Sequence, residues 1–319
     1  MLVLVTGVAG FIGSRLAARL LAEGCDVIGV DAMTDYYDVA LKRENLRRID
    51  HPRLTVVEDD LNRLDLRRLL TDVEVVYHQA GQPGVRASWG QDFARYTRDN
   101  IDATQTLLEA GVRAPRLRRF VLASSSSVYG DAARYPTRES DPTRPVSPYG
   151  VTKLAAEHLG VLYAVNHGLP TVALRYFTVY GPGQRPDMAF TRFCRAAQLG
   201  EEIQLYGSGE QVRDFTFVDD VVEANLRVSS GGSNGTDIPP GTVLNVAGGS
   251  STTVNAVLEL IREISGRDIR INHTAAMLGD VVRTGGCTDA LRAATGWVPR
   301  TPLREGLEEQ YLCSVTVPT

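Results

Sequence analysis

The sequence predicts an α/β protein built on a doubly wound parallel sheet, with a smaller α/β lobe that binds the substrate. Short apolar runs recur through the first half of the chain, segments with apolar residues at helical spacing separate them, and a glycine-rich turn follows the first run. Strands buried on both faces and joined by helices form parallel sheets. With 319 residues, 43% of them hydrophobic, the chain can form one large domain or two.

The individual elements follow from the order of these runs. Seven apolar runs predict strands of the sheet, at residues 2–6, 26–30, 54–58, 74–78, 119–124, 171–177 and 242–249. The stretch FIGSRLAARLLAE (11–23) has the apolar spacing of a helix that packs on the sheet. After residue 176 the alternation becomes irregular, and amphipathic helices are expected at 252–266 and 302–313 in the smaller lobe.

Composition and charge argue against several classes of protein. The net charge is −4 and the arginines are scattered, so no basic block marks a surface for nucleic acid or an anionic membrane. The start, MLVLVTG, lacks the features of a signal peptide, and no apolar stretch approaches the length of a membrane span. The four cysteines show no C-x-x-C spacing, which argues against a metal site or a disulfide framework. We expect a cytoplasmic protein.

The stretch TGVAGFIG (6–13) follows the first predicted strand and opens the first predicted helix. Gly7, Gly10 and Gly13 permit a tight turn, a close approach of the backbone to a pyrophosphate, and close packing of helix on strand. The helix N-terminus favours the anion. This pattern is typical of a dinucleotide-binding Rossmann domain.

Acidic residues after the next two strands support the same interpretation. Asp31 ends the second strand, about 20 residues after the loop, where an acid accepts hydrogen bonds from the adenosine ribose. Because an Asp there would repel a 2′-phosphate, NAD is preferred to NADP, although Lys42 and Arg43 lie near in sequence. Asp60 and Leu61 follow the third strand, where they can meet the adenine.

Hydroxyl groups and a lysine follow the fifth strand. The run VLASSSSVYG (121–130) puts four serines at the end of a buried strand, and SPYGVTKLAAEHLG begins at residue 147. Tyr149 and Lys153 are four residues apart, on one face of a helix. A nearby ammonium lowers the pKa of a phenol, so the pair predicts a tyrosine acid/base. Lys42 and Lys153 are the only lysines, which suggests a role at 153 that arginine does not fill.

These motifs together resemble the extended short-chain dehydrogenase/reductases that act on nucleotide sugars. RYFTVYGPGQRPDMA (175–189) and VRDFTFVDDV (212–221) extend the resemblance over nearly the whole chain. The branch it resembles most is the UDP-hexuronate 4-epimerases, in which DYYDVALKR (35–43) and YGPGQRPDMA are characteristic.

The resemblance assigns roles to the serine run. It implies Ser125, Tyr149 and Lys153 as catalytic residues, with Ser126 and Ser127 holding a sugar carboxylate and Ser124 structural. Four identical residues do not fix the register, so Ser124 stays an alternative to Ser125. The acids that dehydratases and decarboxylases of this family carry after the catalytic hydroxyl are absent at 126 and 127.

The resemblance also implies the remaining binding residues. Thr178 and Arg192 would complete the grip on the carboxylate, Arg213 would hold the diphosphate and Asp280 the uridine ribose. Met277 stands where the family often has Gln. Further residues expected to line the nucleotide are Arg185, Met188 and Gln204, and those expected at NAD are Phe11, Ile12, Lys42, Gln79, Ala80 and Asn100. The histidines have no ligand spacing and are read as structural.

The function predicted is the NAD-dependent interconversion of UDP-glucuronate and UDP-galacturonate through a 4-keto sugar. Residues 1–175, with about 215–250, would form the NAD-binding domain, and residues 176–214 and 251–319 the nucleotide-sugar lobe. The resemblance further implies a homodimer that packs through helices near 90–111 and 148–166. The alternatives are a UDP-glucose/UDP-galactose 4-epimerase, a UDP-glucuronate decarboxylase, and a non-catalytic NAD-sensing protein.

Overall fold

The computed structural model describes residues 1–231, 238–275 and 279–315. Met277 lies outside these residues. The strands are β1 (Leu2–Thr6), β2 (Asp26–Asp31), β3 (Leu54–Glu58), β4 (Val75–His78), β5 (Arg119–Ser125), β6 (Thr171–Tyr176), β7 (Thr178–Tyr180), β8 (Ile203–Tyr206), β9 (Val212–Phe217), β10 (Thr242–Val246), β11 (Ser250–Thr253) and β12 (Ile271–Thr274).

Helices connect these strands. The α-helices are α1 (Phe11–Ala22), α2 (Val39–Arg48), α3 (Leu66–Leu69), α4 (Phe93–Tyr96), α5 (Ala103–Gly111), α6 (Pro148–His167), α7 (Ala189–Leu199), α8 (Val218–Ser229), α9 (Val254–Ser265), α10 (Asp289–Thr295) and α11 (Leu303–Val315). Short 3₁₀ turns lie at η1 (Arg86–Ser88), η2 (Gly90–Asp92) and η4 (Ser126–Val128), and η3 (Thr97–Asp102) is a π-helical segment.

The predicted parallel sheet is confirmed. Seven strands lie in the order β10-β6-β5-β4-β1-β2-β3, and every neighbouring pair is parallel. The order reverses between β1 and β4, which opens a crevice at the carboxyl ends of these strands. Each of the seven predicted runs forms a strand of this sheet, including the late strand β10.

The apolar runs predict that every strand is buried on both faces, but this prediction is wrong for β3. β3 is an edge strand, and none of its residues is fully buried. β5 and β6 lie inside the sheet and are buried along their whole length. A valine-rich run therefore marks a strand here without distinguishing an edge from the centre, because apolar side chains also occur on partly covered edges.

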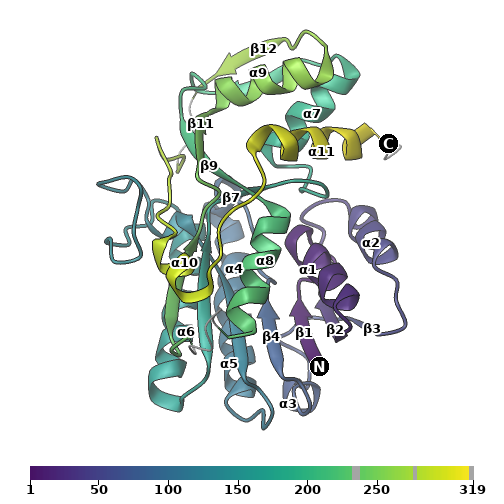
Figure 1. The fold of residues 1–319 in the computed structure, drawn as a ribbon, viewed down its shortest axis with the longest axis vertical. Helices are drawn as coiled ribbons and strands as arrows, with labels where there is room; N and C mark the ends of the chain where they lie inside the picture. Colours follow the sequence, from purple (N-terminus) through teal and green to yellow (C-terminus); the bar gives the residue numbers. More distant parts are fainter. Residues whose placement is uncertain (232–237, 276–278, 316–319) are drawn as a thin grey trace.

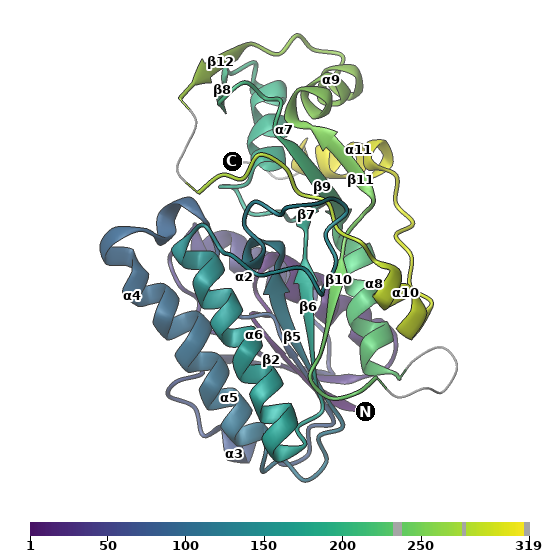
Figure 2. The same cartoon turned by 90° about the vertical axis from the view of Figure 1, so that its left-hand side faces the viewer.

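Helices cover both faces of the sheet. α1 and α8 lie side by side on one face, and α4, α5 and α6 cover the other (Figures 1 and 2). The carboxyl ends of the strands point toward a smaller lobe, in which α7, α9 and α11 pack together with the β8 and β12 pair (Figure 1). The antiparallel pair of β11 and β9, joined by β7, connects the two parts.

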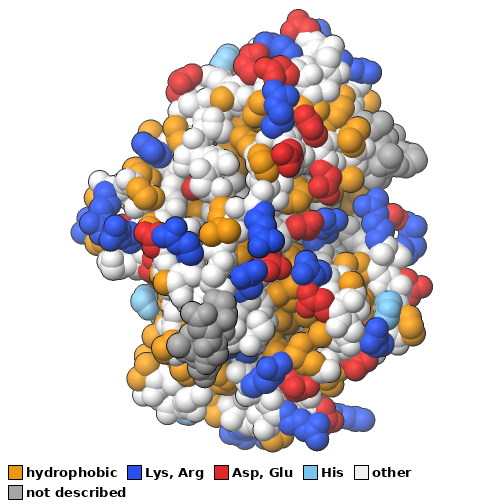
Figure 3. Space-filling view, viewed as in Figure 1, with side chains coloured by type: hydrophobic (Ala, Val, Ile, Leu, Met, Phe, Trp, Pro, Cys, Tyr) orange, Lys and Arg blue, Asp and Glu red, His pale blue; other side chains and the backbone are white. Residues whose placement is uncertain are grey.

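The surface carries both signs of charge. On the face drawn in Figure 3, Lys and Arg side chains alternate with Asp and Glu. Many arginines form surface ion pairs, such as Arg15 with Asp219 and Arg43 with Glu58. No helix of the described residues combines the length and the apolar character that crossing a membrane requires.

Candidate active site

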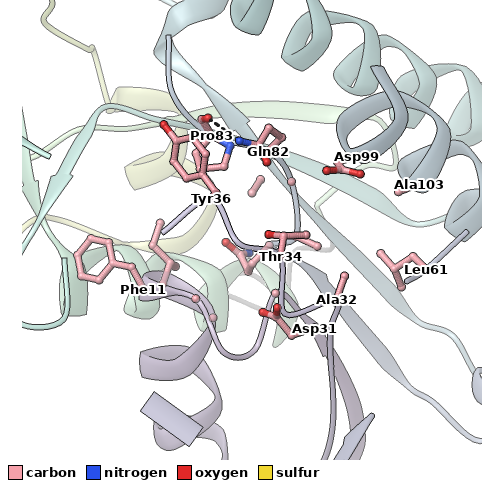
Figure 4. A pocket seen from close by; sticks show the side chains of 18 of the residues that line it. Phe11, Asp31, Ala32, Thr34, Tyr36, Leu61, Gln82, Pro83, Asp99 and Ala103 are labelled. Carbon is pink, nitrogen blue, oxygen red and sulfur yellow. Dashed lines mark hydrogen bonds between the residues drawn. The ribbon is translucent and has the colours of Figure 1, made fainter. Parts of the chain in front are cut away.

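A cleft lies where the sheet order reverses, above the carboxyl ends of β1, β2, β4 and β5. It is lined by the loop after β1, the ends of β2 and β4, the start of α6 and the loop that carries Arg185. Phe11 lies on one side of the cleft and Leu61 and Ala103 on the opposite side, with Asp31 between them (Figure 4). Of the predicted cofactor residues, all except Asn100 line this cleft.

Gly7 and Gly13, in the loop after β1, lie so close to other backbone atoms that a side chain at either position would collide with them. Gly7 has a φ of +70°, and a Cβ there would lie 2.9 Å from the Ala80 nitrogen. A Cβ on Gly13 would lie 2.0 Å from the Gly7 carbonyl oxygen. The N-cap of α1 is Gly10, which provides no side-chain cap, and the first turn contains no acid. The backbone N–H groups of this turn are therefore suited to a pyrophosphate.

Asp31 is buried at the end of β2 and is held by three donors. Its carboxylate accepts hydrogen bonds from the backbone N–H groups of Ala9 (3.1 Å) and Met33 (2.8 Å). It also pairs with the buried Lys42 ammonium at 3.3 Å, and Lys42 donates in addition to Thr34. The carboxylate is thus fixed at the end of β2, and Lys42 partly neutralises its charge.

The opposite end of the cleft has both apolar and acidic side chains at its border. Leu61, Ala103 and Asp99 border it, from the loop after β3 and from η3 and α5 (Figure 4). Asp60 also lines the cleft, where its carboxylate accepts hydrogen bonds from the backbone and side chain of Asn62.

Tyr149 lies on the first turn of α6, at the inner end of the cleft. Burial raises the pKa of this phenol above its ordinary value, whereas a hydrogen bond with Ser125 and the charge of Arg185 lower it. The pKa of Tyr149 is therefore raised, and not lowered as the spacing of Tyr149 and Lys153 predicts, because desolvation outweighs the favourable contacts.

Lys153 lies one helical turn beyond Tyr149 and is also buried. Its ammonium donates a hydrogen bond to the Ala123 carbonyl oxygen at 3.1 Å, and burial lowers the pKa of Lys153 to about 8. A Cβ on Gly81 would come within 3.1 Å of this ammonium. The lysine therefore lies between the end of β5 and the loop after β4, at the floor of the cleft.

Asn100 supports this floor from beneath the cleft. It belongs to the π-helical segment η3 and is almost fully buried. Its side chain accepts from the Gln82 backbone N–H at 2.7 Å and donates to the Gln82 carbonyl and the Thr152 hydroxyl. Asn100 thus joins the loop after β4 to α6, and π-helical turns of this kind are frequent at functional sites.

The serine run separates into two environments. The Ser124 hydroxyl donates to the buried Glu157 carboxylate at 2.7 Å, so it is directed toward α6. The Ser125 hydroxyl accepts from the Ser127 backbone N–H at 3.1 Å and interacts with Tyr149. This geometry favours Ser125 over Ser124 as the partner of Tyr149. Ser126 and Ser127 are half-buried in η4, directly beyond the end of β5.

Two arginines, Arg86 and the predicted substrate residue Arg192, lie over the ring of Tyr206 on β8. The Arg86 guanidinium lies 4.1 Å from the centre of the Tyr206 ring, and that of Arg192 lies 5.9 Å from it. Asp280 pairs with Arg86 at 2.7 Å. Burial lowers the pKa of Arg213, and the charge of Asp280 opposes this shift. Arg213 donates to the carbonyl oxygens of residues 212, 281 and 282.

The other predicted substrate residues lie on β7, on β8 and in the segment that leads into α7. Thr178 begins β7, two residues after Tyr176, which is paired with Ser125 in the sheet. Arg185 lines the NAD cleft and forms an ion pair with Asp187 at 2.9 Å. Met188 is the N-cap of α7, and Gln204 donates to Glu202 on the lobe.

Sequence reasoning missed several residues of the cleft. Tyr36, Gln82 and Pro83 line it, and Tyr36 donates a long hydrogen bond (3.5 Å) to Asp187, the partner of Arg185. Arg86 was also missed. The stretch DYYDVALKR serves in the sequence analysis only to identify the branch of the family. Its position shortly after β2 is the signal that could have placed Tyr36 near the cleft.

His78 has a structural place at the end of β4. His78 is buried between the hydroxyls of Thr6 and Thr104 at 2.8 and 2.9 Å, and burial lowers its pKa to about 3. It is therefore neutral and structural. Within residues 1–231, 238–275 and 279–315, no group of three His, Cys, Asp or Glu side chains could hold a metal ion.

Comparisons with known proteins agree with this geometry. Residues 3–247 match the NAD dependent epimerase/dehydratase family. The chain is 39% identical to the uncharacterized UDP-glucose epimerase YtcB of Bacillus subtilis, with 99% of each chain covered. It is 37% identical to a probable UDP-glucuronate 4-epimerase of Rhizobium meliloti, covering 95% of this chain and 94% of the relative.

Solved structures lead to the same family. The UDP-glucuronic acid 4-epimerase from Bacillus cereus, crystallised with UDP-glucuronic acid and NAD, superimposes with a TM-score of 0.93. It is 37% identical, and 99% of each chain is covered. From the family match, the identity with these relatives and the cleft at the switch point of the sheet, the chain belongs to the NAD dependent epimerase/dehydratase family.

Proposed function

We propose that this protein is an NAD-dependent UDP-glucuronate 4-epimerase, which interconverts UDP-glucuronate and UDP-galacturonate. The observation that carries the proposal is the contact of Ser125 with Tyr149, beside Lys153 at the inner end of a dinucleotide cleft. The relatives named as UDP-glucuronate 4-epimerases support the choice of substrate.

The cleft fits NAD in shape and charge. The glycine loop has no side chains that would keep a pyrophosphate from its backbone, and the first turn of α1 offers backbone N–H groups to the anion. Asp31 is held in place by the Ala9 N–H, where it would meet the ribose. NAD supplies the reversible acceptance and return of a hydride at C4 of the sugar. Because the hydride returns to the same sugar, the reaction needs no external oxidant or reductant.

The residues of this chain handle the proton and the sugar. Tyr149 takes the proton from O4 as C4 is oxidised, and Ser125 hydrogen-bonds O4. The 4-keto sugar would then present its other face to the cofactor, and Tyr149 would return the proton to O4. Lys153 holds the nicotinamide ribose, and its charge stabilises the phenolate once the site is filled. Asn100 keeps the loop after β4 and α6 in register.

The sugar carboxylate would be held by Ser126, Ser127 and Thr178, with Arg192 supplying charge. Ser126 and Ser127 follow β5, and Thr178 begins β7, two residues after the end of the adjacent strand β6, which supports a shared contact with one ligand. Neither position 126 nor position 127 carries the acid that the related dehydratases and decarboxylases use. Those two activities are therefore disfavoured.

Arg213 would bind the diphosphate and Asp280 the uridine ribose. Asp280 pairs with Arg86, whose guanidinium lies over the Tyr206 ring, and the charge of Asp280 also acts on Arg213. Arg185, Met188 and Gln204 would line the rest of the nucleotide site. This division of labour gives residues 1–175 and about 215–250 to NAD, and residues 176–214 and 251–319 to the nucleotide sugar.

The second candidate is a UDP-glucose/UDP-galactose 4-epimerase, which the printed name of the Bacillus subtilis relative favours. Purified protein would be incubated separately with UDP-glucuronate and UDP-glucose, and the sugar H1 and H4 signals followed by NMR. Turnover of UDP-glucuronate alone, or at least tenfold faster, is the expected result. Preferential turnover of UDP-glucose would replace the proposal with the second candidate, and turnover of neither would favour a non-catalytic NAD-binding protein.

A homodimer is also proposed. Apolar side chains of Phe93, Val151 and Leu162 are 39%, 47% and 54% exposed, on α4 and along α6. These helices lie on one outer face of the sheet (Figure 2), where a two-fold contact would cover them. Light scattering at micromolar concentration should give twice the chain mass, and Leu162→Asp should give the monomer. We propose the cytoplasm as its compartment.

A further inference from the structure

A buried polar network lies behind the catalytic residues, and it reaches the cleft only through Ser124, which is among the residues that line it. The Ser124 hydroxyl donates to one oxygen of the Glu157 carboxylate at 2.7 Å. Arg175 donates to both oxygens of the same carboxylate, at 2.9 and 2.6 Å. All three side chains are at least 95% buried.

Stability alone does not explain this network. A buried ion pair loses so much hydration that well-packed apolar residues of similar size are often equally stabilising. The chain nevertheless places Glu157 and Arg175 in the centre of the protein, between α6 and β6, and satisfies both. The position of these groups relative to the catalytic residues suggests another purpose.

Each member is adjacent to a catalytic element. Glu157 follows Lys153 by one turn of α6 and Tyr149 by two, so the three side chains share a face of the helix. Ser124 directly precedes Ser125 in β5, and Arg175 lies opposite Ser124 on β6. The network therefore joins the helix that carries Tyr149 to the strand that carries Ser125.

Apart from the contact of Ser125 with Tyr149, only two side-chain hydrogen bonds join α6 to the end of β5 among the described residues. One runs from Lys153 to the Ala123 carbonyl, and the other from Ser124 to Glu157. We infer that Ser124, Glu157 and Arg175 act as positioning residues, which set the depth and rotation of α6 on β5 and so hold Tyr149 against Ser125. The inference rests on the proposed epimerase function.

Arg175 is itself held in place, as a positioning role requires. Its second terminal nitrogen donates to the Tyr129 hydroxyl at 2.7 Å, and that hydroxyl donates to Asn245 on β10 at 2.8 Å. The Arg175 guanidinium also lies 4.7 Å from the centre of the Tyr129 ring. The carboxylate of Glu157 is therefore anchored to the sheet through Arg175, and the Ser124 hydroxyl donates to an acceptor that other hydrogen bonds hold in place.

The test compares Ser124→Ala with a matched control in the NAD-loaded enzyme. A misplacement of about 1 Å can cost about a hundredfold in rate, so loss of one of two anchors should lower kcat about tenfold. KM for UDP-glucuronate should change less than about twofold, because the Ser124 hydroxyl is engaged by the Glu157 carboxylate. The kcat of each variant is calculated per mole of bound NAD, because unfolded protein binds no NAD and is then left out of the enzyme concentration.

The control is Ser229→Ala. Ser229 is similarly buried, and its hydroxyl bonds to Tyr77 at 2.6 Å, away from the cleft. Both variants should unfold more easily, but only Ser124→Ala should lower kcat. With UDP-glucuronate deuterated at C4, Ser124→Ala should also show a larger kinetic isotope effect on kcat than wild type and Ser229→Ala, because hydride transfer becomes slower than the other steps.

The outcomes separate the inference from the function on which it rests. If wild type does not turn over UDP-glucuronate, the proposed function fails. If wild type is active and Ser124→Ala matches Ser229→Ala in kcat and isotope effect, the network is structural and the inference is overturned. Should Ser124→Ala fail to fold, Ser124→Cys, which is nearly isosteric and a weak donor, decides by the same criteria, with a smaller loss of kcat expected.

Discussion

Replacing Lys153 with methionine should stabilise the NAD-free protein at neutral pH while it removes activity. Burial lowers the pKa of Lys153 from 10.5 to about 8 in the folded protein, whereas the unfolded chain keeps the ordinary value. At about 1.36 kcal/mol for each pH unit, this difference costs the fold about 3 kcal/mol when the lysine is protonated. Methionine fills a similar volume without that cost.

Part of the gain is offset by a lost contact. The Lys153 ammonium donates to the Ala123 carbonyl oxygen at 3.1 Å, and a charged hydrogen bond contributes about 1.5 to 3 kcal/mol. The net stabilisation expected from Lys153→Met at pH 7 is therefore about 1 kcal/mol, or about 2 °C in Tm. Activity should nevertheless fall by at least about a hundredfold, because the charge beside Tyr149 is lost.

The pH dependence follows from the direction of the shift. Below pH 8 both states of the wild type are protonated, so the full cost is present. As pH rises from about 8 to 10.5, the folded state loses its proton first and the wild type becomes relatively more stable. The advantage of Lys153→Met should therefore shrink and then reverse across this window. Urea unfolding of NAD-free protein at pH 7, 8.5 and 9.5 measures it.

Lys42→Met is the matched control, since Lys42 is the other lysine of the chain and is also buried. Lys42 pairs with the buried Asp31, so its removal leaves a carboxylate with less compensation and should destabilise at every pH tested. The reasoning on Lys153 is refuted if Lys153→Met destabilises by the same amount at pH 7 and pH 9.5.

Three further predictions concern the site itself. Tyr149→Phe should lower kcat by about 10² to 10⁴-fold and leave the amount of bound NAD unchanged, as measured by absorbance of the extracted cofactor; a near-normal rate would make Tyr149 a packing residue. Gly13→Ala should lose NAD, because its Cβ would lie 2.0 Å from the Gly7 carbonyl oxygen, and cofactor retained at wild-type occupancy would contradict that geometry. Arg192→Ala should weaken binding of UDP-glucuronate about tenfold to a hundredfold, and should also release more decarboxylated 4-keto-pentose, since the 4-keto sugar is a β-keto acid; mass spectrometry with no increase in that product would limit Arg192 to binding.

Much of the fold could be predicted because parallel strands leave a local pattern. The runs at 2–6, 119–124 and 242–249 are apolar because their strands are covered by helices on both faces, and each became a strand of the predicted sheet. The glycine loop was equally readable, since its spacing reflects steric limits that act within a few residues. The exposed edge position of β3 was not, because strand order depends on contacts between distant segments.

The candidate site was predictable where it lies close to such motifs. The structure brings the loop after β1, Asp31, Tyr149 and Lys153 into one cleft, as the order of motifs had indicated. Local sequence does not reveal how far an exposed loop folds back, so the contacts of Tyr36 and Arg86 were missed. Met277 lies outside the described residues, and the roles of the remaining site residues stay predictions.

Sequence alone determined the parallel α/β fold, the dinucleotide loop and the pairing of a tyrosine with a lysine on one helical face, because each depends on spacing along the chain. Tertiary structure decided which serine faces Tyr149, since four identical hydroxyls differ only in their neighbours, and Glu157 lies 33 residues from Ser124. Tertiary structure also decided the direction of the pKa shift of Tyr149, which burial raises. Desolvation depends on everything packed around a group, and that packing is assembled from segments that are distant in sequence.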